Sequence, residues 1–226
     1  MLRLFLVSLG KVCEEEMKMY QLLAIFIDVV CVGVIFVPVF WFVCGRALWW
    51  ESKRRMCLLL CFGLYLAAVF SVTGMPDIRS LVFDPAFHFL PFVDVVNSPF
   101  SYTCNSILNM ILFVPLGVMT PILWEKFRDL RRIALLGFGV SFFIEASQIF
   151  TFRLTDIDDL LMNTAGAVLG FLLLRAFCKK DGKRLLPEEN QNEKRKKEFG
   201  IMFGMVFALM FLVTPFLSGM IWEMIL

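Results

Sequence analysis

The chain has 226 residues, of which 59% are hydrophobic and only 19% are charged. Soluble domains carry about 25% charged residues, and a domain of this length could not bury so much apolar surface in one core. The net charge of +2 gives no indication of a nucleic-acid-binding protein. The composition therefore predicts an all-α integral membrane protein. We expect the lipid bilayer to be its main binding partner.

The cysteine and histidine content indicates neither a disulfide framework nor a metal site. The seven Cys lie mostly in apolar runs, where Cys behaves as a small hydrophobic residue, and His88 is the only His. A soft-metal site needs several such ligands close together. We expect no metal and no cofactor.

Six apolar stretches approach the ~20 residues that a helix needs to cross a bilayer. In chain order they cover roughly 22–44, 56–72, 105–124, 133–150, 160–177 and 200–222. We therefore predict a bundle of about six transmembrane helices. The predicted organisation is an N-terminal segment over 1–20, a five-helix membrane domain over 21–178, a basic cytoplasmic loop over 179–199, and the sixth helix with the C-terminus over 200–226.

Lys and Arg are concentrated in three of the five connections between these stretches. The first, third and fifth connections are basic, whereas the second and fourth hold only Arg79 and Arg153. Because cytoplasmic loops carry an excess of Lys and Arg, we expect these three inside the cell and both termini outside. The loop over 179–199 could bind acidic lipid, but several Glu residues interrupt its charge, which favours a solvated linker.

Polar side chains inside the predicted helices need an explanation, because each charge costs roughly 2.5–3.5 kcal/mol on insertion scales. Glu145 and Gln148 share one face of the fourth helix, and further polar residues form a stripe at the start of the fifth. Helix rise places polar groups of the third, fourth and fifth helices about 6 to 9 Å from their outer ends. The predicted functional cluster consists of Asn109, Glu145, Gln148, Arg153, Asp156, Asp159 and Asn163.

Two interpretations fit this convergence. Polar pairs commonly hold membrane helices together without any further role, and Gly166-x-x-x-Gly170 is a pattern typical of close helix packing. The pattern Gly200-x-x-x-Gly204 could do the same for the sixth helix. The meeting of several carboxylates, amides and an Arg beneath an outer loop favours a functional pocket over this purely structural interpretation.

Two further polar residues are candidate accessory residues. Asp28 lies in the first predicted helix at a similar depth. His88 lies in the long connection over 73–104, which we expect to lie along the outer membrane surface or to fold back over the helices. His88 could accept a proton, although a single His among aromatic residues is more often structural.

Three stretches of the chain share a pattern with a known family. They are His88-Phe-Leu-Pro-Phe92, then Asn109-Met-Ile-Leu-Phe-Val-Pro-Leu-Gly117, and a third that runs Glu145-x-x-Gln148, Arg153-x-x-Asp156-Ile157-Asp158-Asp159 and Asn163-Thr164-x-Gly166-x-x-x-Gly170. Together, over roughly 58–177, they resemble the VanZ-like family of bacterial membrane proteins. Two departures are His88, where the family usually has Asn, and Phe152, where many members have Gly before the Arg.

The resemblance implies a multi-pass protein of the bacterial cell membrane with a role at the cell envelope. The founding activity of the family is low-level resistance to the lipoglycopeptide teicoplanin. On this basis we hypothesise that the chain binds or handles an amphiphilic envelope ligand at the outward-facing cluster. Such a ligand would be a lipid-linked cell-wall precursor or a glycopeptide, with Arg153 pairing with its phosphate or carboxylate.

Two other functions stay open at this stage. Paired carboxylates could act as acid and base in an intramembrane hydrolase or transferase that acts on a lipid-linked substrate. The absence of a nucleophile elbow, a zinc motif or a Walker loop favours a non-enzymatic protein. A proton-coupled transporter would use Asp28 and Glu145 as a relay, but few polar residues lie in the predicted inner half of the membrane.

Overall fold

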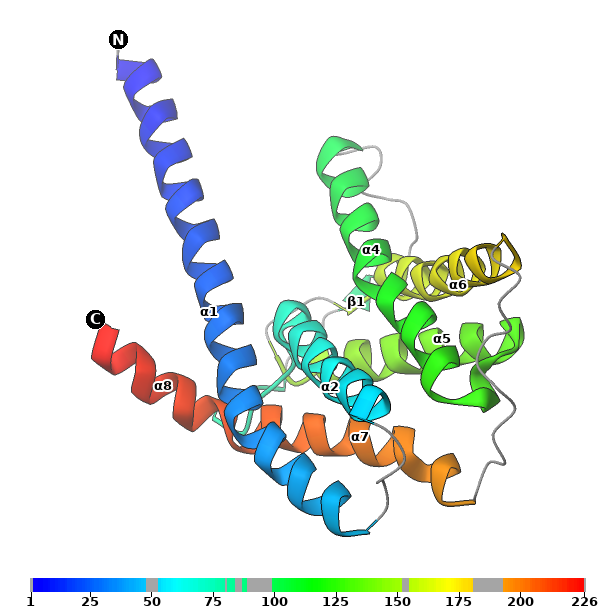
Figure 1. Ribbon diagram of the computed structural model, residues 1–226. Coiled ribbons are helices and arrows are strands. Elements are labelled where there is room, and N and C mark those ends of the chain that lie inside the picture. Colours follow the sequence, from blue (N-terminus) through cyan, green and yellow to red (C-terminus); the bar gives the residue numbers. More distant parts are fainter. Residues whose placement is uncertain are drawn as a thin grey trace.

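The computed structural model describes residues 2–47, 53–79, 81–83, 87–88, 99–151, 155–180 and 193–225. These ranges are almost entirely helical, which confirms the all-α prediction (Figure 1). A short 3-10 helix, η1 (Glu125–Phe127), and two strands of two residues each, β1 (Phe87–His88) and β2 (Thr155–Asp156), complete the described structure. The seven α-helices are α1 (Leu2–Ala47), α2 (Lys53–Thr73), α4 (Pro99–Leu123), α5 (Leu130–Gln148), α6 (Ile157–Lys180), α7 (Glu193–Leu212) and α8 (Thr214–Ile225).

Four helices of the described part are long and apolar enough to cross a membrane. The segments lie in α1 (Leu22–Phe42), α2 (Lys53–Thr73), α4 (Tyr102–Leu123) and α6 (Ile157–Cys178). A fifth span results if α7 and α8, bent by 44° at a short break, count as one. The described residues therefore contain four or five candidate spans, which imply contact with the lipid bilayer.

One of the six predicted spans is not among these. α5 corresponds to the predicted fourth span, but its 19 residues include Arg131, Arg132 and Glu145. The predicted sixth span, expected to run continuously over 200–222, is divided into α7 and α8. The multi-span membrane architecture is confirmed, whereas the number six is not.

Proline explains the break between α7 and α8. Pro215 has no backbone N–H, so the carbonyl of Phe211 loses its helical partner four residues later. The N–H of Ile78 donates to this carbonyl at 3.1 Å instead. The segment after α2 is therefore attached to the bend of the last helix pair, and it also contacts the end of α5 through a 3.0 Å bond from Val82 N to Phe150 O. The described part of this segment therefore folds back over the helices. This is one of the two arrangements that we expected for the connection over 73–104.

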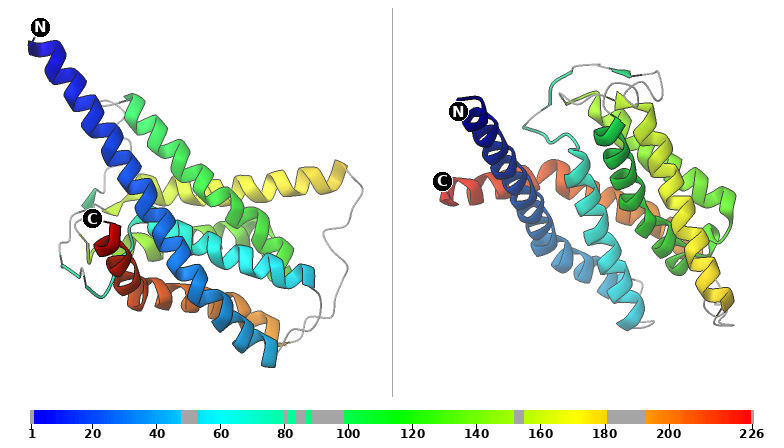
Figure 2. Two further views of the ribbon diagram at one scale, coloured as in Figure 1. Left: turned by 60° about the vertical axis from the view of Figure 1, so that its left-hand side comes forward. Right: turned by 90° about the horizontal axis from the view of Figure 1, so that it is seen from above.

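The helix ends fall into two groups at opposite ends of the bundle. Figure 2 shows the C-terminal end of α1, the start of α2, the α4–α5 junction, the end of α6 and the start of α7 at one end. The end of α2, the paired strands, the start of α6 and the α7–α8 junction lie at the other. The three basic connections of the sequence thus leave from the same end. α1 is 46 residues long, and its N-terminal half extends away from the other helices (Figure 1).

The backbones of α4 and α6 are in direct contact. A Cβ at Gly166 would overlap with the carbonyl oxygen of Met110, and one at Gly170 with that of Val114. The Gly166-x-x-x-Gly170 prediction is therefore confirmed, because only glycine allows the two backbones to touch here. The corresponding expectation for Gly200 and Gly204 is wrong, since a Cβ at either position would meet no atom within 4 Å.

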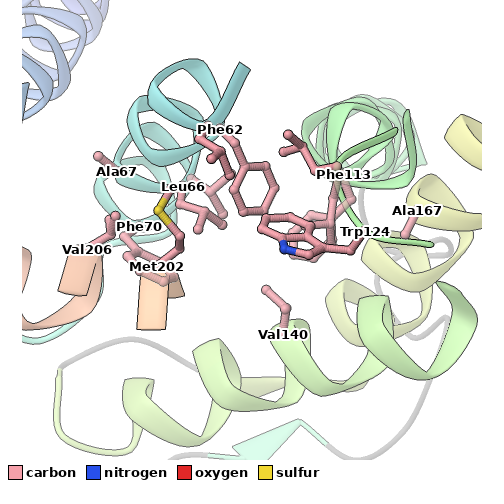
Figure 3. Close-up of a cluster of buried hydrophobic side chains, with 14 of the residues drawn as sticks. Phe62, Leu66, Ala67, Phe70, Phe113, Trp124, Val140, Ala167, Met202 and Val206 are labelled. Atoms are coloured by element: carbon pink, nitrogen blue, oxygen red, sulfur yellow. The ribbon is translucent and has the colours of Figure 1, made fainter. Parts of the chain in front are cut away.

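The apolar core lies where α2 faces α4 and α7 (Figure 3). Phe62 of α2 packs edge-on against Trp124, with ring centroids 5.2 Å apart, and Phe70 packs edge-on against Phe203 of α7 at 5.3 Å. Such aromatic pairs contribute about 0.5–1.5 kcal/mol beyond simple area burial. These contacts connect α7 to α2, and α2 to the α4–α5–α6 unit.

Candidate functional site

The polar cluster begins where the chain enters α6. Oδ1 of Asp156 accepts a 2.9 Å hydrogen bond from the N–H of Asp158, which satisfies one of the unpaired donors of the first helical turn. Glu145 of α5 is buried, at 4% exposure, and its Oε2 accepts the N–H of Asp156 at 3.0 Å. A charged acceptor makes this a strong hydrogen bond, so Glu145 fixes the start of α6 against α5.

The second contact of the cluster joins α4 to α6. Nδ2 of Asn109 donates to Oδ1 of Asp159 at 2.5 Å, and both side chains are half-buried. Asp159 lies about two helical turns before Gly166 on α6, and Asn109 is next to Met110, whose carbonyl oxygen Gly166 faces. The close approach imposed by the glycines therefore brings the amide and the carboxylate within bonding distance.

The third contact joins α5 to α6 at a deeper level. Nδ2 of Asn163 donates to Oγ of Ser141 at 3.0 Å, and both residues are buried. Oδ1 of Asn163 is also buried but has no hydrogen-bond partner among the described residues. An acceptor that is left without a donor in a dry environment costs about 1–3 kcal/mol.

Gln148 connects α5 to α2. Its Nε2 donates to the backbone carbonyl of Thr73 at 2.9 Å. Thr73 is the last residue of α2, where a helix leaves its final carbonyls without helical partners. Gln148 therefore contacts α2, whereas the side-chain hydrogen bonds just given for Asn109, Glu145 and Asn163 join α4, α5 and α6.

Three further residues near the cluster were not among the predicted site residues. Ser141 lies one turn before Glu145 on α5, and this i, i+4 spacing was a signal that could have found it. Asp158 is buried at the start of α6, and its carboxylate lies next to the Tyr102 hydroxyl of α4. With these residues, the set of neighbouring polar side chains extends from Asn163 to Tyr102 in the first turn of α4.

The remaining predicted residues fall in other places. Asp28 is on the α1 side of α2, where its Oδ2 accepts a hydrogen bond from Ser71 Oγ at 2.8 Å. The backbone of His88 pairs with that of Asp156 in the two-stranded β1–β2 pairing, so the long second connection reaches the cluster. The side chain of His88 and the whole of Arg153 lie outside the described residues.

Carboxylates, amides and hydroxyls dominate this site, and together they offer both hydrogen-bond donors and acceptors. Among the described residues, no three His, Cys, Asp or Glu side chains are placed to hold a metal ion. Such a set of groups is suited to recognising the hydroxyls and amides of a sugar or a peptide.

A family model described as VanZ/LLP1 matches residues 58–178. The match covers the stretch on which the sequence resemblance rests, and it contains the polar cluster from Asn109 to Asn163. α1, α7 and α8 lie outside it, as does Asp28. No curated protein and no solved structure matches the chain.

Proposed function

This chain belongs to the VanZ/LLP1 family, and we propose from this premise that it binds an amphiphilic ligand of the bacterial cell envelope. The binding site would be the polar cluster of α4, α5 and α6. The ligand would be a lipid-linked cell-wall precursor or a lipoglycopeptide such as teicoplanin, and binding would contribute to resistance against the latter.

The proposed topology has six spans in the bacterial cell membrane. α5 would cross the bilayer with its two N-terminal Arg residues at the interface and Glu145 paired near the opposite end. α7 and α8 would together form the sixth span. With the basic connections in the cytoplasm, the cluster would lie near the outer face, where envelope precursors and glycopeptides are found.

The observation that carries the proposal is the meeting of polar groups from three helices along the first two turns of α6. Asn109, Glu145 and Asn163 come from α4, α5 and α6, and each is bonded to a different helix or to its start. One such pair would suffice to hold two helices together, and double-mutant cycles give only about 0.6 kcal/mol for an average pair. Three pairs around a glycine contact exceed what packing requires.

The unpaired acceptor of Asn163 supports binding over a purely structural role. A purely structural hydrogen bond would satisfy the amide fully, whereas Oδ1 remains buried without a described donor. A hydroxyl or N–H of a ligand would donate a hydrogen bond to Oδ1, and this bond would be stronger in the low dielectric of the site than in water. The cluster would recognise the polar part of the ligand, and the surrounding lipid would hold its hydrophobic tail.

Direct binding tests the proposal. Purified protein in nanodiscs would be titrated with teicoplanin and with a lipid-linked cell-wall precursor. The comparison is between the wild type, Glu145→Gln, and the control Thr120→Val. The first substitution removes the buried charge but keeps an acceptor for Asp156 N. The control removes a buried hydroxyl that bonds only within α4, at Leu116 O.

The proposal predicts that at least one probe binds to the wild type and to Thr120→Val, and that Glu145→Gln weakens this binding by tenfold or more. A charge-assisted hydrogen bond contributes about 1.5–3 kcal/mol, which corresponds to this factor. If neither probe binds to the wild type, or if Glu145→Gln binds as well as the control, the cluster is not a site for such ligands.

A further inference from the structure

A second charged region lies at the opposite end of the bundle from the polar cluster. It is formed by the first turn of α2, by η1 and by the start of α5. Nη1 of Arg55 donates to the carbonyl of Leu123 at 3.2 Å, and Nη1 of Arg132 donates to that of Lys126 at 3.1 Å. These contacts make the region continuous. We call it the basic end, and its cations are Lys53, Arg54, Arg55, Lys126, Arg128, Arg131 and Arg132.

Part of this charge is neutralised inside the protein. Nη2 of Arg55 lies 2.6 Å from Oε2 of Glu198, which is 1% exposed and also accepts the indole N–H of Trp124 at 3.1 Å. Arg128 lies 3.5 Å from Glu125. The carboxylates of Glu198 and Glu125 therefore pair with Arg55 and Arg128, the two partly buried arginines of the region.

The outermost cations are not neutralised in this way. Lys53, Arg54 and Arg131 are exposed, and they form no ion pair with any described residue. Arg131 stands in the first turn of α5, two residues after the N-cap residue Asp129, whose carboxylate makes no capping hydrogen bond. The positive end of the helix dipole adds to the positive charge of Arg131, and a bound anion would be stabilised there.

Lys126 lies at the boundary between the charges and the aromatic core. Its ammonium is 4.7 Å from the ring centroid of Phe127 and 5.8 Å from that of Phe199. Burial lowers the pKa of Lys126, and the charge of Glu198 opposes this shift. The combination of cations above and aromatic rings below is typical of the level at which lipid headgroups lie.

We propose that the basic end is a binding site for anionic phospholipid, with Lys53, Arg54 and Arg131 as the exposed cations that attract the headgroup phosphate. The position favours lipid over a soluble anion, because Lys53 begins the membrane-spanning segment of α2 and acyl chains can lie along the apolar helices below it. Anionic lipid at this face would also fix the depth and orientation of the bundle in the bilayer.

The test uses the purified protein in neutral detergent, titrated separately with phosphatidylglycerol and with phosphatidylcholine of the same acyl chains, and followed by native mass spectrometry. The test variant is Lys53→Gln/Arg54→Gln/Arg131→Gln, whose side chains have no described polar contact to lose. The control is Asp129→Asn, which changes a carboxylate of the same region and leaves a residue that is also suited to its N-cap position.

We expect phosphatidylglycerol to bind more tightly than phosphatidylcholine to the wild type. Each cation near an anionic surface contributes roughly a fivefold change in binding, so the triple variant should lose on the order of 100-fold. Asp129→Asn should bind as tightly as the wild type or up to about fivefold more tightly. The preference of the wild type should also decrease between low and high salt, which tests the charge contribution without any substitution.

Equal binding of the two lipids, or a triple variant with wild-type preference, would overturn the proposal. So would a preference that does not respond to salt. Competition by soluble glycerol 3-phosphate at the same concentration as the lipid would show a site for the phosphate group alone, and the assignment to a membrane lipid would then be wrong.

Discussion

The ion pair between Arg55 and Glu198 leads to an asymmetric prediction. The two side chains meet at 2.6 Å, but Glu198 is 1% exposed whereas Arg55 is 17% exposed. In Arg55→Gln the carboxylate of Glu198 stays buried without its cation. In Glu198→Gln the longer Arg55 side chain can reach water, and the new amide still accepts the N–H of Trp124.

Breaking a buried pair so that one charge remains uncompensated costs about 3–5 kcal/mol. We expect Arg55→Gln to lower the free energy of unfolding by an amount in this range. Glu198→Gln should cost only about 1–2 kcal/mol, close to the loss of one charge-assisted hydrogen bond. The double variant should be less destabilised than the sum, because no buried charge remains in it.

Equilibrium unfolding in mixed micelles with increasing SDS measures these differences. The result also reports on how α7 is held, because Glu198 adds polar contacts to Arg55 of α2 and to Trp124 after α4, beside the aromatic contacts of α7. Equal losses for the two single variants, or a larger loss for Glu198→Gln, would refute the reasoning from exposure.

Three further predictions concern the α4–α6 contact and the cluster. Gly166→Ala should lower the free energy of unfolding by about 1–3 kcal/mol, because its methyl group meets backbone, whereas Gly204→Ala should be neutral or stabilising by up to about 1 kcal/mol. A double-mutant cycle of Asn109→Leu and Asp159→Leu should show a coupling of about 0.6–1.7 kcal/mol, and a value near zero would contradict the hydrogen bond. Expression of the wild type in a susceptible Gram-positive host should raise the minimum inhibitory concentration of teicoplanin, whereas equally expressed Glu145→Gln should not; an unchanged value for the wild type would separate this chain from the founding activity of its family.

Hydropathy located most of the helices, because the free energy of transferring a stretch of chain into lipid depends mainly on which side chains the stretch contains. It missed residues 2–20 of α1, because three consecutive Glu residues end a short apolar run that cannot span a bilayer by itself, although this part is helical. It also missed the break after α7, although Thr214-Pro215 was a visible signal, since the residue before Pro is disfavoured in a helix.

Helical spacing placed Asp159 and Asn163 on one stripe, and the structure agrees that both face neighbouring helices. Spacing cannot identify the partner across an interface, because that depends on the rotation and order of the helices. Ser141 was missed for this reason, and the rotation of α1, which turns Asp28 toward Ser71 on α2, could not be predicted either. The two-stranded pairing that brings His88 beside Asp156 could not be predicted from two residues.

Asn163 offers the most direct test of ligand binding at the cluster. Asn163→Leu removes the whole amide, whereas Ser141→Ala removes only the partner of Nδ2 and leaves the unpaired Oδ1 in place. The measurement is the affinity of each variant, in nanodiscs, for the probe that the wild type binds. We predict a loss of tenfold or more for Asn163→Leu and less than threefold for Ser141→Ala. Equal affinities in the two variants would show that Asn163 only joins α5 to α6, and would contradict a ligand site at this level.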